Sequence, residues 1–217
     1  MDITHIKSQF PIFSKKINGK QLVYLDSSNS AQKPTSVLKA LDNFYKNDFS
    51  NVGRSIHALA VNATNKFEET RVNVKNFINA ESKDEIIFTK NATESINLVA
   101  NTFGKQNIKK GDEILITELE HHSNYVPWHY LRETYGAIIK FAPINEDGDI
   151  IISKFKELIT SKTKIIAITH LSNVTGTIVP IKEIVEIARK KNVPVLVDGC
   201  QSAPHIKIDV KDLDCDF

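Results

Sequence analysis

The chain has 217 residues, and its 28 lysines and arginines nearly balance its 26 aspartates and glutamates. This balance argues against a nucleic-acid or membrane-surface protein. No apolar run approaches the about 20 residues of a membrane span, the N-terminus lacks a signal-peptide layout, and two cysteines form no disulfide framework or zinc motif. We therefore expect a cytoplasmic chain without nucleic-acid or membrane partners.

Short apolar runs typical of β-strands alternate with amphipathic, helix-like patterns along the chain. In chain order, we expect a strand over 22–26, helices over 36–47 and 63–78, a strand over 85–89, a helix over 93–104, a strand over 112–117, a helix over 125–136, strands over 137–142 and 164–170, a helix over 180–192 and a strand over 193–198.

Strands that are apolar throughout and separated by helices predict an α/β fold with a mostly parallel sheet buried on both faces. Ligands of such sheets bind beyond the carboxyl ends of the strands. Four polar segments follow expected strands: Lys90–Thr93, Glu118–Asn124, His170–Thr175 and Asp198–Gln201. The spacing of the eight glycines excludes GxGxxG and GxxxxGK[ST], and neither GxSxG nor HExxH occurs.

The first of these segments indicates an anion site. Asn91 is suited to cap a helix and Glu94 to complete a capping-box-like arrangement, which leaves the amides of Ala92 and Thr93 at the positive end of the helix dipole. A phosphate would bind there. An ordinary helix cap is the alternative.

The second segment contains His121 and His122. Adjacent side chains on extended backbone point to opposite sides, and neither histidine has HxH or HxxxH spacing, so we expect no metal site. An imidazole just past a strand end could stack on a planar ligand or move protons. A plain surface histidine is the alternative.

The last two segments supply Asn173, Asp198 and Gln201. A carboxylate at the end of a buried strand needs a partner, and a protonated ring nitrogen would be one. Asn173 could equally be a loop-forming residue and Asp198 a helix cap. Together, the segments meet the binding needs of pyridoxal 5′-phosphate (PLP).

The chain resembles the SufS-type cysteine desulfurases of the class V aminotransferase family. The resemblance rests on "YLDSSNSAQKP" (24–34), "RSIHALA" (54–60), "ATESINLVAN" (92–101), "EHHSNYVPWH" (120–129), "THLSNVTGT" (169–177), "VDGCQSAPH" (197–205) and "DVKDLDCDF" (209–217). It implies the PLP-dependent transferase fold of type I, the aspartate aminotransferase-like fold, with residues 1–217 forming the N-terminal segment and the first part of the large domain.

The resemblance also implies roles for single residues. Asp198 would pair with the pyridine nitrogen of PLP, and His121 would stack on the ring and assist proton transfer. Asn173 and Gln201 would lie near the phenolic oxygen, and Ala92 and Thr93 would hold the phosphate.

More weakly, the resemblance places Arg54 and His57 at the substrate approach. It implies L-cysteine as the substrate, L-alanine and an enzyme persulfide as products, a homodimer and a Suf-type sulfur acceptor. Selenocysteine lyase, cysteine sulfinate desulfinase and a non-catalytic remnant are the alternatives.

Two features depart from the family pattern. Ser28 and Asn29 stand where relatives usually have small residues, and Gly53 stands where they have histidine.

The lysine that binds PLP and the nucleophilic cysteine of the family lie beyond Phe217, so we expect a fragment that is inactive alone. Cys200 is expected to be a small packing residue rather than a nucleophile, and 215–217 to open another strand.

Overall fold

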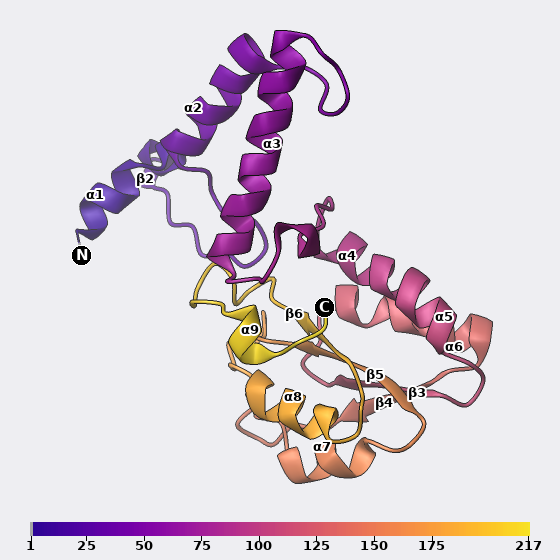
Figure 1. Cartoon of the computed structure of the whole chain (residues 1–217). Helices are drawn as coiled ribbons and strands as arrows, with labels where there is room; N and C mark the ends of the chain where they lie inside the picture. The colour runs from indigo at the N-terminus through magenta and orange to yellow at the C-terminus, as the bar shows by residue number, and fades with distance from the viewer. Residues whose placement is uncertain (1) are drawn as a thin grey trace. The chain divides into compact units, whose positions relative to one another are not determined.

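The computed structural model describes residues 2–217, which divide into two compact units at Asn73 and Val74. The first unit contains several short helices, most of one long helix and one β-hairpin (Figure 1). Its elements are α1 (Ile3–Ser8), η1 (Pro11–Ser14), β1 (Lys16–Ile17), β2 (Lys20–Gln21), α2 (Thr35–Asn43), the π-helical turn η2 (Phe44–Asp48) and most of α3 (Ala58–Phe77).

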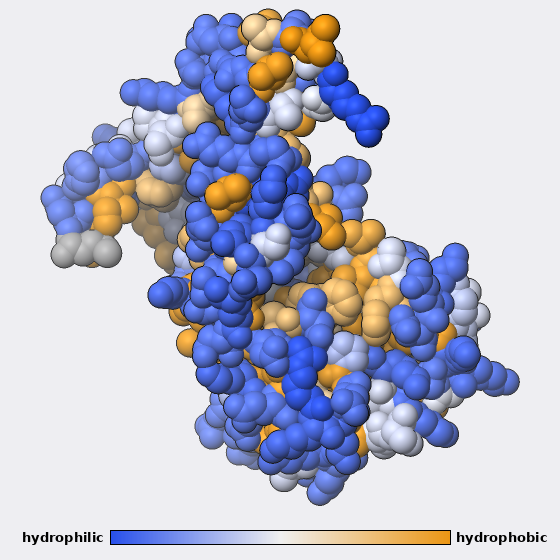
Figure 2. Space-filling model, viewed as in Figure 1, coloured by the Kyte–Doolittle hydropathy of each residue, from blue (hydrophilic) through white to orange (hydrophobic). Residues whose placement is uncertain are grey.

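The predicted strand over 22–26 is wrong. The amide of Leu22 still donates to the carbonyl of Lys15 at 3.2 Å, but residues 22–26 belong to no strand, and Val23 and Leu25 are 77% and 90% exposed. An apolar run becomes a strand only where another strand accepts its hydrogen bonds. Figure 2 shows apolar patches between the hydrophilic regions of the surface.

The second unit alternates helices and strands, as predicted. Its elements are η3 (Lys83–Glu85), α4 (Ala92–Val99), the π-helical turn η4 (Ala100–Gly104), α5 (Lys105–Asn107), β3 (Glu113–Thr117), η5 (His122–Asn124), α6 (Val126–Tyr135), β4 (Ile138–Ala142), α7 (Ile152–Leu158), β5 (Thr163–Thr169), α8 (Ile181–Arg189), β6 (Val195–Asp198) and α9 (Val210–Leu213).

Four of these strands form one parallel sheet in the order β4-β3-β5-β6, which confirms the predicted α/β class. Helices cover both faces of the sheet (Figure 1). On one face, α4 and α6 pack side chains such as Ile96, Trp128 and Leu131 against the strands. On the other, α7 and α8 contribute Phe155 and Ile184. The sheet is therefore the middle layer of three.

The predicted strand over 85–89 is also wrong. Glu85 ends η3, and residues 86–89 are extended but belong to no strand in the described part of the chain. Ile87 remains 68% exposed, as expected where no neighbouring strand covers it. Helix α7, by contrast, was not predicted, and α3 begins at Ala58 rather than at residue 63.

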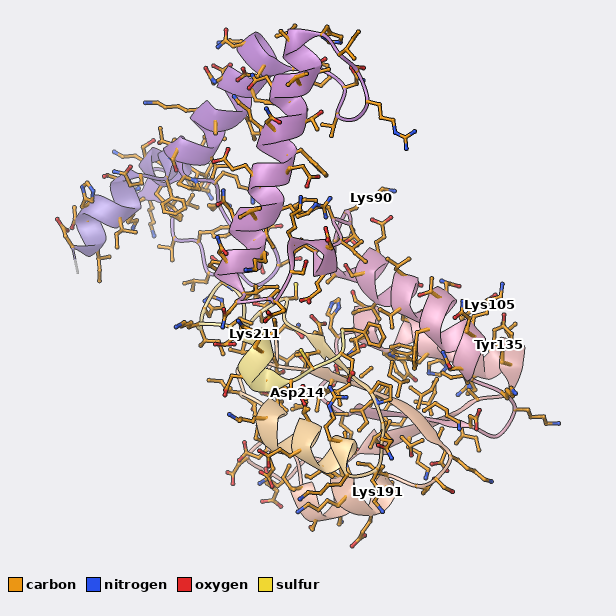
Figure 3. All side chains as sticks on the ribbon, viewed as in Figure 1. Lys90, Lys105, Tyr135, Lys191, Lys211 and Asp214 are labelled. Carbon is orange, nitrogen blue, oxygen red and sulfur yellow. The ribbon has the colours of Figure 1, made fainter. Side chains whose placement is uncertain are left out.

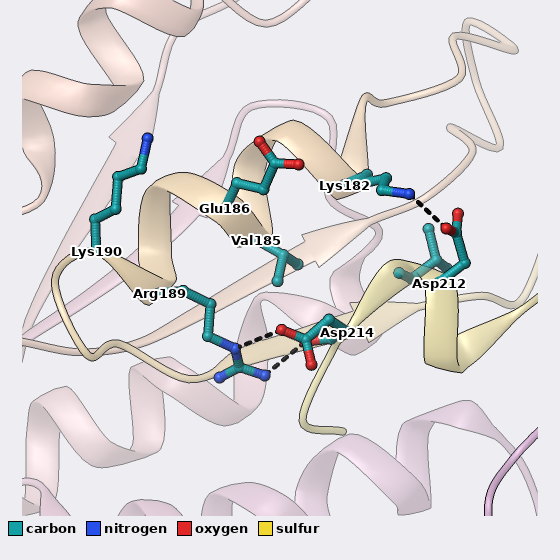
Figure 4. A pocket seen from close by; sticks show the side chains of 8 residues that line it. Lys182, Val185, Glu186, Arg189, Lys190, Asp212 and Asp214 are labelled. Carbon is teal, nitrogen blue, oxygen red and sulfur yellow. Dashed lines mark hydrogen bonds and ion pairs between the residues drawn. The ribbon is translucent and has the colours of Figure 1, made fainter.

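The C-terminal residues lie along the free edge of β6. The amide of Val197 donates to the carbonyl of Phe217 at 3.0 Å, and the amide of Phe217 donates to the carbonyl of Val195 at 3.3 Å. This is the hydrogen-bond pattern of a parallel pair, but residues 215–217 are assigned to no strand, so the expected strand stays a prediction. Arg189 of α8 holds the segment through an ion pair with Asp214 at 3.0 Å (Figure 4) and another with Asp216 at 2.9 Å.

Candidate functional site

Helix α4 begins as the sequence predicts. The side chain of Asn91 caps it by accepting from the amide of Glu94 at 2.9 Å. The carboxylate of Glu94 accepts from the amide of Lys90, one residue before the position of a standard capping box. Lys90 precedes the helix, and its side chain extends away from the ribbon (Figure 3). The amides of Ala92 and Thr93 lie in the first turn, where helix geometry provides no intrahelical acceptor.

His121 lies in the loop that follows β3, at the cap position of η5. Its Nδ1 atom accepts from the amide of Ser123 at 3.2 Å and lies 3.0 Å from the Ser123 hydroxyl. That hydroxyl is 2.8 Å from the hydroxyl of Thr93. The structure therefore brings His121 and the start of α4 together through Ser123, a residue that the sequence analysis did not single out.

Asp198 is the last residue of β6, where it pairs with Thr169 of β5. It is 8% exposed, and its carboxylate accepts from the amide of Cys200 at 3.0 Å. The amide of His170 donates to the backbone carbonyl of Asp198 at 2.9 Å. The carboxylate is thus nearly buried on a rigid strand end, where a cationic partner would stabilise its charge.

One pocket of about 240 Å³ lies between the first turns of α4 and the end of β6. It is lined by Ala92 and Ser95 from α4 and by Asp198 and Cys200 from the end of β6. The lining does not include Thr93, His121, Asn173 or Gln201. The helix start suits a phosphate and the Asp198 carboxylate suits a protonated ring nitrogen, so these two groups are compatible with PLP, while the rest of the lining is mainly apolar.

The remaining predicted site residues have different surroundings. Asn173 lies in an exposed turn that follows β5, and Gln201 lies in the turn after β6. Arg54 and His57 belong to the first unit, where both are exposed and His57 accepts from the amide of Ala60 at 3.3 Å. Gly53 has a φ of 137°, a conformation that glycine adopts far more readily than histidine.

Glu120 is a buried carboxyl group that the sequence analysis did not assign. One oxygen accepts from the Thr117 hydroxyl at 2.6 Å and from the Thr169 amide at 3.0 Å, and the other accepts from the Asn124 side chain at 2.7 Å. Burial raises the pKa of Glu120 to about 7, and the negative charge of Asp198 adds to this effect. The residue therefore connects the ends of β3 and β5 to η5.

Cys200 is exposed, so the expected packing role is wrong. Partial burial of the thiol raises its pKa, and the neighbouring Asp198 raises it further. A thiol in this setting stays protonated near neutral pH, which is unfavourable for a nucleophile.

No group of three or more metal-binding side chains is found among residues 2–217, and no helix there is long and apolar enough to cross a membrane.

Residues 23–217 match the family described as Aminotransferase class-V. The chain belongs to this family. A class-V relative, the probable cysteine desulfurase of Halalkalibacterium halodurans, is 49% identical over 217 residues, which are 100% of this chain and 53% of the relative. The chain thus spans about half the length of the curated relatives that it matches.

Solved class-V structures show the same fold. The apo cysteine desulfurase of Thermococcus onnurineus has a TM-score of 0.91 and 34% identity, over 99% of this chain and 51% of its own. A C-DES variant with glycine covalently linked to its PLP cofactor has a TM-score of 0.79 and 25% identity, over 97% of this chain and 53% of its own. The family is PLP-dependent, and curated relatives such as those of Halalkalibacterium halodurans and Cronobacter sakazakii are described as cysteine desulfurases.

Proposed function

We propose that this chain is the N-terminal part of a PLP-dependent cysteine desulfurase. The pocket lined by both Ala92 and Asp198 carries the proposal, because it joins a helix start suited to phosphate with a nearly buried carboxylate suited to a ring nitrogen. The relationship to cysteine desulfurases supplies the substrate class.

In this proposal, the amides of Ala92 and Thr93 hold the phosphate of PLP, and the carboxylate of Asp198 keeps the ring nitrogen protonated. His121 lies against the ring, and Asn173 and Gln201 serve its phenolic oxygen. Bound PLP supplies an electron sink for bonds at the α-carbon of an amino acid. Arg54 and His57 would contact the substrate.

The overall reaction converts L-cysteine and an enzyme thiol to L-alanine and an enzyme persulfide. The persulfide sulfur then passes to an acceptor of the Suf type for iron–sulfur cluster assembly. We propose a homodimer as the working form and the cytoplasm as its location. The raised pKa of Cys200 argues against Cys200 as this thiol, because the thiolate is the reactive form.

Binding of PLP by the 217-residue chain tests the proposal without requiring turnover. PLP is titrated into the chain and followed by its absorbance, with the wild type compared to Asp198→Asn. We expect the variant to bind about 10- to 100-fold more weakly, because a hydrogen bond to a charged group contributes about 1.5–3 kcal/mol.

Asp147→Asn is the matched control, because Asp147 lies exposed in the turn after β4 and should leave the affinity unchanged. Equal affinity of the wild type and Asp198→Asn would contradict the assignment of Asp198. Failure of the wild type to bind PLP would contradict the assignment of the pocket.

A further inference from the structure

The Nδ1 atom of His121 faces two groups of one residue, Ser123. The backbone amide of Ser123 is 3.2 Å from Nδ1, and the hydroxyl is 3.0 Å from it. A backbone amide can only donate a hydrogen bond, so Nδ1 must be an acceptor in the neutral ring. In a neutral imidazole the other nitrogen then carries the proton.

The hydroxyl of Ser123 extends this arrangement to α4. It is 2.8 Å from the hydroxyl of Thr93. If Nδ1 accepts from Ser123, the Ser123 oxygen is free to accept from Thr93. The three groups then form one directed series in which Thr93 donates to Ser123 and Ser123 donates to His121.

We infer that Ser123 is a positioning residue, which keeps the proton of neutral His121 on Nε2 and couples the imidazole to Thr93 at the start of α4. This inference rests on the proposed function for its meaning. Proton transfers that use His121 would pass through Nε2, and a phosphate contact at Thr93 would be sensed by the imidazole.

The turn that carries Ser123 is anchored in the core. Asn124, the next residue, is completely buried and donates its amide hydrogen to Glu120 at 2.7 Å. Its carbonyl oxygen accepts from the indole of Trp128 at 3.2 Å. The backbone amide of Asn124 also donates to the carbonyl of His121 at 2.8 Å. The contacts of Ser123 therefore belong to a fixed turn and not to a mobile surface loop.

The tautomer of His121 can be measured by nuclear magnetic resonance on the ¹⁵N-labelled chain without any ligand. Long-range correlation spectra at about pH 8.5, above the usual histidine pKa of about 6.5, show which imidazole nitrogen carries the proton. His121→Gln identifies the signals among those of the seven histidines. We expect Nε2 to be protonated and Nδ1 to be an acceptor.

A double-mutant comparison then tests the coupling. We expect Thr93→Val to shift the His121 Nδ1 resonance in the wild-type background and to leave it unmoved in the Ser123→Ala background. Ser123→Thr keeps the hydroxyl and should restore the response. Ser95→Ala is the control on the same helix, because its hydroxyl contacts Thr89 at 2.7 Å rather than the His121 loop.

A proton on Nδ1 in the wild type would overturn the inference. The inference would also be overturned if Thr93→Val left the His121 Nδ1 resonance unmoved in the wild-type background. An equal shift in the wild-type and Ser123→Ala backgrounds would overturn it as well. Unchanged signals of the other histidines show that a variant is folded, and Ser123→Thr repeats the comparison if Ser123→Ala is not. Because PLP takes no part, failure to bind PLP would refute the proposed function and leave this result intact.

Discussion

Replacing Glu120 with glutamine should remove a pH dependence from the stability of the second unit. Burial raises the pKa of this carboxyl group from an ordinary value of 4.5 to about 7. At about 1.4 kcal/mol per pH unit, the difference corresponds to about 3 kcal/mol. The folded chain holds this proton more tightly than the unfolded chain does. The stabilisation is therefore complete below pH 4.5 and is lost as the pH rises to about 7.

Glutamine cannot titrate, so the variant should lack this decrease of about 3 kcal/mol in the free energy of unfolding. Its carbonyl oxygen can still accept from Thr117 and Thr169, but its amino group would meet the amino group of Asn124. A pH-independent cost of about 1 kcal/mol is therefore expected as well. The slope with pH, and not the absolute stability, is the quantity that tests the reasoning.

Urea unfolding between about pH 5 and about pH 8 measures that slope. Trp128 is the single tryptophan, is completely buried and donates to Asn124, so its fluorescence reports on this region. Glu133→Gln on α6 is the matched control, because the side chain of Glu133 is 71% exposed. Equal slopes in the wild type and Glu120→Gln would refute the reasoning.

Three further predictions concern the packing of the second unit. Lys140→Met removes the partner of Glu113 at 2.8 Å and should cost about 3 kcal/mol in urea unfolding at neutral pH. Burial raises the pKa of Glu113, but the hydrogen bonds from Lys140, Thr160 and Thr163 together with the charge of Lys140 outweigh it and lower the pKa overall. The cost of the substitution should therefore shrink as the pH falls through that pKa, and a constant cost would contradict the ion pair. Gly104→Ala would place a methyl group 2.7 Å from Leu131 and should lower stability by about 1–3 kcal/mol in thermal unfolding, whereas no loss would show that the core yields there. Arg189→Gln should cost only about 1 kcal/mol, because its ion pairs are partly exposed, yet hydrogen exchange at the free edge of β6 should accelerate, and unchanged exchange would show that the ion pairs do not hold the C-terminal segment.

The sheet of the second unit was predictable because each of its strands is a short apolar run between helix patterns. Burial on both faces of a parallel sheet requires such runs, so the boundaries agree within two residues. The strands predicted over 22–26 and 85–89 are absent for a different reason. Both segments are apolar enough for strands, but pairing depends on a neighbour that local sequence does not reveal.

The candidate site was partly predictable for a related reason. Parallel strands end at one edge of the sheet, so the polar residues after β3, β5 and β6 were expected to lie there. The roles of Glu120 and Ser123 could not be predicted, because they depend on which side chains meet between elements. The burial of Glu120 and the 2.8 Å contact between Ser123 and Thr93 arise only in the folded chain.

The position of Asp198 depends on how β6 is registered against β5. Leu196 faces α4 and α6, and Asp198, two residues later, lies on the same side. A slip of one residue would turn the carboxylate toward α7 and α8. An insertion between α8 and β6 that shifts this register should therefore abolish PLP binding, whereas the exposed turn at 146–147, which takes part in no proposed contact, should tolerate added length. The chain thus contains a length-sensitive connection before β6 and a length-tolerant one after β4, which is a practical guide for placing tags and labels.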